Sequence, residues 1–134
     1  MLFRSNGTIS FQSEGADGGK IIDGQNSNSI PCLDFNEYLE KFHFIDFLKM
    51  DIEGAETAVI THCRSQLKKV KYFFVEYHSE KGEPQTLDIL LGILKETGFR
   101  YYIEDMHKRK NKFRNSEEES FDLQLNIYAS NTER

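Results

Sequence analysis

Three charged side chains alternate along one short segment, at Lys49, Asp51 and Glu53. Side chains two residues apart in an extended strand point to the same side, so these three are expected to share one face at the end of a strand. Glu76 and His78 repeat the spacing at the end of the next apolar run. An unpaired ion buried in protein costs roughly several kcal/mol. Such groups are therefore expected to be paired, solvated or used to bind a ligand.

The segments that must position these side chains are predicted to be two buried strands. Residues 44–51 form a mostly apolar run of strand length, which predicts a central, buried strand. Residues 72–75 form an aromatic and β-branched run that continues to His78 and predicts a second one. In open α/β sheets ligands bind beyond the carboxyl ends of the strands, so both charged groups are expected in one crevice. The alternative, that Lys49 pairs with Asp51 or Glu76 while His78 is solvated, fits the spacing equally well.

Helix signals separate the strands. Asp34 with Glu37 predicts a capped helix start, with Leu33 and Tyr38 spaced as a hydrophobic staple, and this helix is expected to end at about Phe42. A second helix is predicted after Gly54 and a third is predicted to begin near Pro84 and stop at Gly98. Their apolar stripes comprise Ala55, Ala58, Val59, Cys63, Leu67 and Val70 in the second, and Leu87, Leu90, Leu91 and Leu94 in the third.

The remaining segments complete an α/β fold of one domain, residues 1–134. Residues 7–12 alternate in polarity and predict a short edge strand, and residues 13–29 are rich in turn-forming types and predict a surface loop. Residues 100–105 and 122–130 are predicted to pair as an antiparallel hairpin. Strands that alternate with helices favour a parallel sheet, so the whole sheet is expected to be mostly parallel with this antiparallel pair at its C-terminal end.

Composition excludes several classes of partner. The formal net charge of -5 argues against a general affinity for nucleic acid, which depends on clustered Lys and Arg. The basic run at residues 108–114 is followed at once by acidic residues 117–119 and is interpreted as a solvated loop. No apolar run approaches the length of a membrane span or a secretory signal, which predicts no membrane partner and a cytoplasmic protein. Cys32 and Cys63 lack redox or zinc spacing and are expected to be thiols.

One signature carries a family resemblance. Residues 45–56 read Ile-Asp-Phe-Leu-Lys-Met-Asp-Ile-Glu-Gly-Ala-Glu and resemble the Asp-Leu-Leu-Lys-Ile-Asp-Val-Glu-Gly-Ala-Glu signature of the FkbM-type methyltransferases. Residues 32–35 resemble the helix start of that family, and residues 74–78 resemble its next strand, which ends Val-Glu-x-His. Residues 98–101 and 125–129 are similar to its closing hairpin. The resemblance runs from about Gly7 onward.

The resemblance implies a class I, Rossmann-like methyltransferase that uses S-adenosylmethionine as cofactor. The expected reaction is methyl transfer to a hydroxyl oxygen of a small-molecule acceptor such as a sugar. Asp51 would orient or deprotonate the acceptor, or contact the methionyl end of the cofactor. Lys49 and Glu53 would shape the charge around it, Glu76 and His78 would line the acceptor side, and His78 is an alternative base because its ordinary pKa lies near neutrality.

The front of the chain departs from the family pattern. Family members have a strand ending in a glycine-rich turn, and then an acidic residue that binds ribose, and neither precedes Met1. Residues 15–20 do not replace that turn, because they follow no buried strand and lead into no helix. We therefore expect the C-terminal part of a methyltransferase domain, without most of its cofactor-binding half. An uncovered sheet edge predicts a homodimer.

Two other functions fit the same residues. The first is a non-catalytic remnant that keeps the fold and acts as an interaction module. The second is a metal-dependent hydrolase that uses Asp51, Glu53 and Glu76 as oxygen ligands. Carboxylates are common at strand ends, so no metal is expected.

Overall fold

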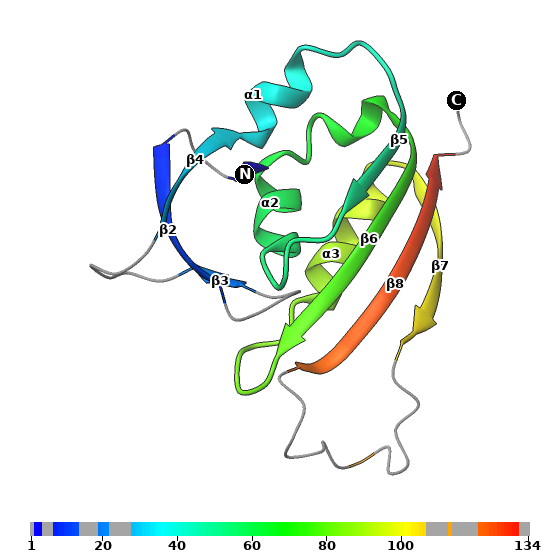
Figure 1. Cartoon of the computed structure of the whole chain (residues 1–134). Coiled ribbons are helices and arrows are strands. Elements are labelled where there is room, and N and C mark those ends of the chain that lie inside the picture. The colour runs from blue at the N-terminus through cyan, green and yellow to red at the C-terminus, as the bar shows by residue number, and fades with distance from the viewer. Residues whose placement is uncertain are drawn as a thin grey trace. The chain divides into compact units, whose positions relative to one another are not determined.

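The computed structural model describes residues 2–3, 7–13, 19–21, 28–106, 113 and 121–131. Contacts between residues divide the chain into two compact units, here called the N-terminal unit (Met1–Lys41) and the C-terminal unit (Phe42–Arg134). Each unit holds a four-stranded sheet (Figure 1). The predicted α/β class is confirmed, and the expectation of a single domain stays a prediction.

The N-terminal unit consists of four strands and one short helix. They are β1 (Leu2–Phe3), β2 (Gly7–Ser13), β3 (Gly19–Ile21), β4 (Asn28–Asp34) and α1 (Phe35–Glu40). The strand order is β1-β4-β2-β3, in which β2 is antiparallel to both of its neighbours and β1 is parallel to β4.

Two predictions for this unit need correction. The strand expected at residues 7–12 is present as β2, but it lies between β3 and β4 rather than at an edge. The surface loop expected at residues 13–29 is wrong at β3 and at the start of β4. Strand pairing uses backbone N–H and C=O groups, which nearly every residue supplies, so a composition rich in turn formers did not prevent strands from forming.

The predicted start of α1 is confirmed. Oδ1 of Asp34 accepts hydrogen bonds from the backbone N–H of Asn36 at 2.8 Å and of Glu37 at 3.2 Å. These bonds satisfy two donors that the first turn of a helix leaves without partners. The helix ends at Glu40, two residues before the predicted Phe42.

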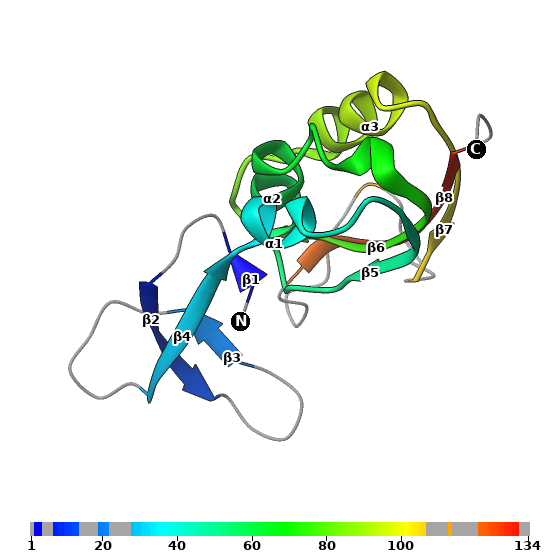
Figure 2. The ribbon, with the colours of Figure 1, turned by 90° about the horizontal axis from the view of Figure 1, so that it is seen from above.

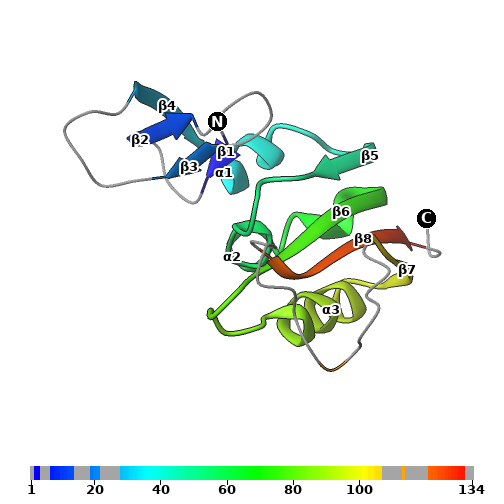
Figure 3. The same cartoon turned by 60° about the horizontal axis from the view of Figure 1, so that its bottom comes forward.

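The C-terminal unit builds the second sheet in the order β5-β6-β8-β7. Its elements are β5 (Ile45–Met50), α2 (Glu56–His62), the 3-10 turn η1 (Leu67–Lys69), β6 (Val70–Glu80), α3 (Leu87–Glu96), β7 (Phe99–Asp105) and β8 (Phe121–Asn131). β5 and β6 are parallel, whereas β8 is antiparallel to β6 on one side and to β7 on the other. Figure 3 shows β6 and β8 running together through the middle of this sheet.

The predicted hairpin is confirmed, but the prediction of a mostly parallel sheet is wrong. One of the pairings in the C-terminal unit is parallel and two are antiparallel. The reason is the length and position of β8, which spans eleven residues and inserts between β6 and β7. Alternation of strands and helices indicates the parallel β5–β6 pair, but it does not reveal where a C-terminal strand inserts.

The core of this unit lies between the sheet and its helices. α2 and α3 lie on one face of the sheet (Figure 2). Phe73, Val75 and Tyr77 of β6 are buried, and Tyr77 accepts a hydrogen bond on its hydroxyl from the N–H of Thr86 at the start of α3. Alternation along β6 therefore sends Phe74, Glu76 and His78 to the opposite face, which we call the site face.

The strand β5 differs from its predicted place. Among the described residues it pairs with β6 alone, which makes it an edge strand of the second sheet rather than a central one. Met50 is its one buried residue, and Phe47 on the site face is 62% exposed. An apolar run cannot distinguish a central strand from an edge strand whose site face carries aromatic side chains.

The predicted second helix is shorter than its stripe suggested. α2 ends at His62, Ala58 is exposed, and Val70 already belongs to β6. Thr61 donates a hydrogen bond from its hydroxyl to the carbonyl oxygen of Thr57, and weak helix formers follow it, which favours an early end. The third helix is confirmed as α3, although it begins at Leu87, three residues after Pro84.

Three smaller predictions concern the cysteines, the membrane and the basic run. Cys32 and Cys63 are buried and form no disulfide, as expected. No helix in the described part of the chain is long and apolar enough to cross a membrane. The basic run at residues 108–114 lies, apart from Phe113, outside the described residues.

Candidate functional site

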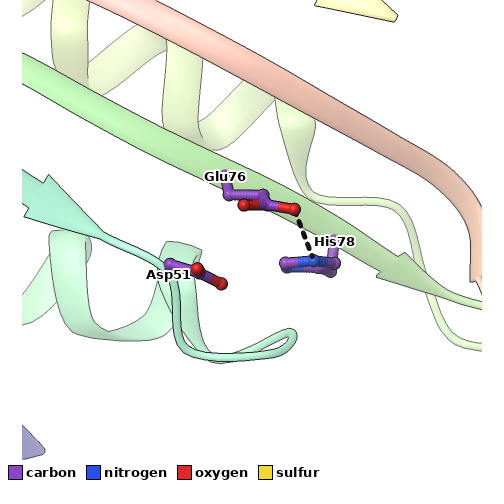
Figure 4. Close-up of side chains that lie close together, drawn as sticks. All are labelled: Asp51, Glu76 and His78. Atoms are coloured by element: carbon purple, nitrogen blue, oxygen red, sulfur yellow. Dashed lines mark ion pairs between the residues drawn. The ribbon is translucent and has the colours of Figure 1, made fainter. Parts of the chain in front are cut away.

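The predicted meeting of the two strand ends is confirmed by the positions of three side chains. Asp51 directly follows β5, while Glu76 and His78 lie on the site face of β6 (Figure 4). One oxygen of each carboxylate and one ring nitrogen of His78 all lie within 4.8 Å of one another. Because β5 and β6 are parallel and adjacent, the carboxyl end of β5 opens beside the middle of the longer β6.

Lys49 lies beside this cluster and pairs with Asp51. Its Nζ is 3.3 Å from Oδ2 of Asp51, with the two side chains 58% and 32% exposed. The same Nζ lies 5.8 Å from the centre of the Phe74 ring. Ion pairs this exposed contribute about 0–1 kcal/mol, so the pair orients Asp51 more than it stabilises the fold.

Glu53 lies in the cluster, but for a different structural reason from the one predicted. β5 ends at Met50, so strand alternation does not place Glu53. It has a φ of 54°, in the left-handed region, and Gly54 follows with a φ of 96°. This turn brings Oε2 of Glu53 to 3.8 Å from Nε2 of His78 while the Glu53 side chain stays 51% exposed.

Glu76 is held from the neighbouring strand β8. Its Oε1 accepts a hydrogen bond of 2.6 Å from Nε2 of Gln124 and lies 3.6 Å from Nε2 of His78. Gln124 is the β8 partner of His78 in the strand register, which explains its position. Sequence reasoning missed Gln124, because its role depends on a register that the charged segment before β8 does not reveal.

His78 is buried, so the alternative in which it is simply solvated is wrong. Its side chain is 1% exposed, and its ring lies against Phe121 with 4.8 Å between ring centres. Nδ1 lies 3.2 Å from Oε1 of Glu56, and Nε2 lies 3.3 Å from Nε2 of Gln124. Both ring nitrogens therefore have polar neighbours despite the burial.

The charges around His78 raise its pKa above the ordinary value of 6.5. Burial alone would lower this pKa, because it disfavours the charged ring. The hydrogen bond to Glu56 and the negative charges of Glu56, Glu53 and Glu76 outweigh that effect.

Glu56 is the second residue that sequence reasoning missed. It is 0% exposed, and its Oε1 accepts from the backbone N–H of Ile52 at 3.1 Å and of Gly54 at 3.0 Å. The N–H of Gly54 is also 3.1 Å from Oε2. The available signal was a glutamate at the start of a helix whose stripe faces the core, because an ionisable group in that place must have partners.

The cluster as a whole concentrates negative charge. Carboxylates at positions 51, 53, 56 and 76 surround one imidazole, with Lys49 as the nearby cation. Such a group can accept a proton or bind a cationic part of a ligand. Asp51, Glu76 and His78 also offer the ligand types that divalent cations take. In this group His78 stands in place of Glu53, which the sequence suggested as a metal ligand. The expectation of no metal stays a prediction.

Comparison with known proteins now gives this cluster a context. Searches of curated proteins and of solved structures give no match. The family model described as the methyltransferase FkbM domain matches residues 4–101, a range that contains Asp51, Glu76 and His78 and ends within β7. Because this match covers more than half of the sequence and confirms the predicted resemblance, the chain belongs to the FkbM methyltransferase family.

Proposed function

We propose that the chain carries out methyl transfer from S-adenosylmethionine to a hydroxyl oxygen of a small molecule such as a sugar. The observation that carries the proposal is the convergence of Asp51, Glu76 and His78 beyond β5, in a chain of a methyltransferase family. The parallel β5–β6 pair, joined through α2, further supports reading the second sheet as part of a Rossmann-like methyltransferase sheet.

The charge of the cluster fits one end of the cofactor. S-adenosylmethionine has a positively charged sulfur and an ammonium group at its methionyl end, and carboxylates favour both. Asp51 and Glu53 are accessible enough to meet such a ligand, with side chains 32% and 51% exposed. When bound, the cofactor supplies a methyl group activated by the positive sulfur. In this proposal Asp51 holds the methionyl end or the acceptor hydroxyl.

The remaining residues take the roles of orienting the acceptor and removing its proton. Asp51 is the first choice of base, because Lys49 orients its carboxylate at the accessible side of the cluster. His78 is the alternative base, and with Glu76 it lines the acceptor side. A positioned base contributes typically about 10²–10⁴-fold to the rate. Holding donor and acceptor in line supplies much of the rest.

Titration calorimetry with S-adenosylmethionine tests this proposal. We expect the wild-type chain to bind. If Asp51 holds the methionyl end, Asp51→Asn should bind about ten- to a hundredfold more weakly, because a hydrogen bond to a charged group contributes about 1.5–3 kcal/mol. If Asp51 holds the acceptor hydroxyl, this variant should bind the cofactor like the wild type. Asp46→Asn is the matched control, since Asp46 is an exposed aspartate of β5 outside the cluster, and it should bind like the wild type. Absence of binding by the wild-type chain would overturn the proposal.

One observation favours a second candidate, the non-catalytic interaction module. The site face carries exposed aromatic side chains on several strands: Phe47, Tyr72, Tyr102 and Tyr128. Exposed apolar groups gathered on one face often mark interaction surfaces. If the calorimetry shows no binding of cofactor, this surface becomes the leading explanation for the retained fold.

A further inference from the structure

We propose that Glu56 is a positioning residue that holds His78 as the tautomer with hydrogen on Nδ1, so that the lone pair of Nε2 faces the carboxylate cluster. The catalytic use of this arrangement rests on the proposed function. The tautomer itself is a property of the folded chain and can be measured without any substrate.

The first step of the argument is that Glu56 itself is fixed. Its carboxylate is fully buried and receives the backbone N–H of Ile52 and of Gly54. These donors come from the turn between β5 and α2, and Glu56 is the first residue of α2. The side chain therefore cannot rotate away without breaking its hydrogen bonds to both N–H groups of this turn.

The second step concerns the proton between Glu56 and His78. An ionised carboxylate offers only acceptor lone pairs, so the 3.2 Å contact from its Oε1 to Nδ1 is a hydrogen bond only if Nδ1 carries the hydrogen. In the neutral ring the other nitrogen, Nε2, is then an acceptor. The Nε2–H tautomer would instead place a lone pair of Nδ1 against a buried negative charge.

On the other side of the ring, the nearest polar atom to Nε2 is the Gln124 amide nitrogen at 3.3 Å, and the carboxylates of Glu76 and Glu53 lie farther away at 3.6 and 3.8 Å. Gln124 donates from its Nε2 to Oε1 of Glu76 at 2.6 Å, which leaves a second hydrogen on the same amide nitrogen. That nitrogen lies 3.3 Å from Nε2 of His78, so it can donate there if Nε2 has a lone pair. The two sides of His78 thus favour the same tautomer from different elements, α2 and β8.

For the alternative in which His78 is the base, this arrangement would let the ring accept a proton from the acceptor hydroxyl. The proton would bind Nε2, where Glu76 and Glu53 lie at 3.6 and 3.8 Å, while Glu56 balances the charge from the Nδ1 side. Glu56 has no exposed surface and would act only through His78 and through the turn that carries Glu53. It is therefore a positioning residue and not a catalytic one.

The test is the nitrogen NMR spectrum of the histidine rings in the ¹⁵N-labelled wild-type chain, at a pH where they are neutral. We expect a protonated Nδ1 and an unprotonated Nε2 for His78, whose signals are identified by their loss in His78→Gln. The exposed His43 serves as an internal reference and should show the Nε2–H form that predominates in free histidine. An Nε2–H tautomer at His78 would overturn the proposal.

Glu56→Leu gives the second measurement. Leucine removes the acceptor from Nδ1, so we expect the share of the Nδ1–H form to fall, whereas Glu83→Leu, at an exposed glutamate, should leave the tautomer unchanged. Retention of the full Nδ1–H signal in folded Glu56→Leu would contradict the role of Glu56. If that variant does not fold, the wild-type spectrum still shows which nitrogen of His78 carries the hydrogen. If His78 is the Nδ1–H tautomer but the wild-type chain does not bind S-adenosylmethionine, the proposed function is wrong and the assignment of the tautomer stands.

Discussion

The raised pKa of His78 links the candidate site to the stability of the fold. In the unfolded chain this ring has its ordinary pKa of 6.5, whereas in the folded chain the hydrogen bond to Glu56 and the nearby carboxylates outweigh burial and raise it. The folded state therefore holds the proton more tightly than the unfolded state. The resulting stabilisation is complete below about pH 6.5 and is lost as the pH rises through the raised value.

Urea unfolding at a series of pH values tests this linkage. We expect the difference in unfolding free energy between wild type and His78→Gln to be largest on the acid side of neutrality and to shrink as the pH increases. His43→Gln is the control, because His43 is exposed and lies outside the carboxylate cluster. A wild-type advantage that grows with pH would contradict the raised pKa.

At this scale the sequence predicted the meeting of Asp51, Glu76 and His78 but not what holds them. The meeting follows from two strand ends and their alternation, which sequence patterns reveal. The contacts of Glu56 and Gln124 depend on a tight turn and on a strand register. Neither the turn nor the register produces a periodic pattern in the sequence, so these two residues could not be assigned to the site.

Among the elements, α3 shows where apolar periodicity is most reliable. Leu90 is 0% exposed and Leu94 is equally buried, as their spacing predicts. β6 was likewise predictable from its aromatic run. The early end of α2 and the edge position of β5 were not, because they depend on local competition for hydrogen bonds and on which strands are available as neighbours.

Truncation of one leucine in α3 should show this packing directly. Leu90→Ala is expected to lower the free energy of unfolding by about 2–5 kcal/mol, because it leaves a cavity in a close-packed core. Ile89→Ala in the same helix is the matched control, since Ile89 is 48% exposed, and it should cost less than about 1 kcal/mol. Chemical denaturation measures both, and equal losses would contradict the assigned core.

At the scale of the whole molecule, the edge strand β5 bears on self-association. Within the described residues its outer edge has no partner strand, and Phe47 is 62% exposed beside it. Unpaired backbone groups along an edge can pair with another chain. We therefore propose that two copies associate through β5.

Sizing across a range of concentrations tests this association. The wild-type chain should shift from monomer to dimer as its concentration rises, whereas Phe47→Lys should stay monomeric at the same concentrations, because a lysine on an edge strand opposes pairing. Ile89→Lys, an exposed position of α3, is the control for added charge. A wild-type monomer throughout would show that the edge does not associate.

The left-handed backbone at Glu53 has a consequence for engineering this protein. A side chain in that conformation costs about 1–2 kcal/mol, and glycine would relieve this strain while losing part of the gain to its greater freedom when unfolded. Glu53→Gly should therefore raise the melting temperature slightly or leave it unchanged, as scanning calorimetry would show. Directed evolution that selects only for heat resistance would therefore favour glycine at position 53. That glycine removes one carboxylate beside His78. Selection for thermal stability and selection for activity would thus favour different residues at this position.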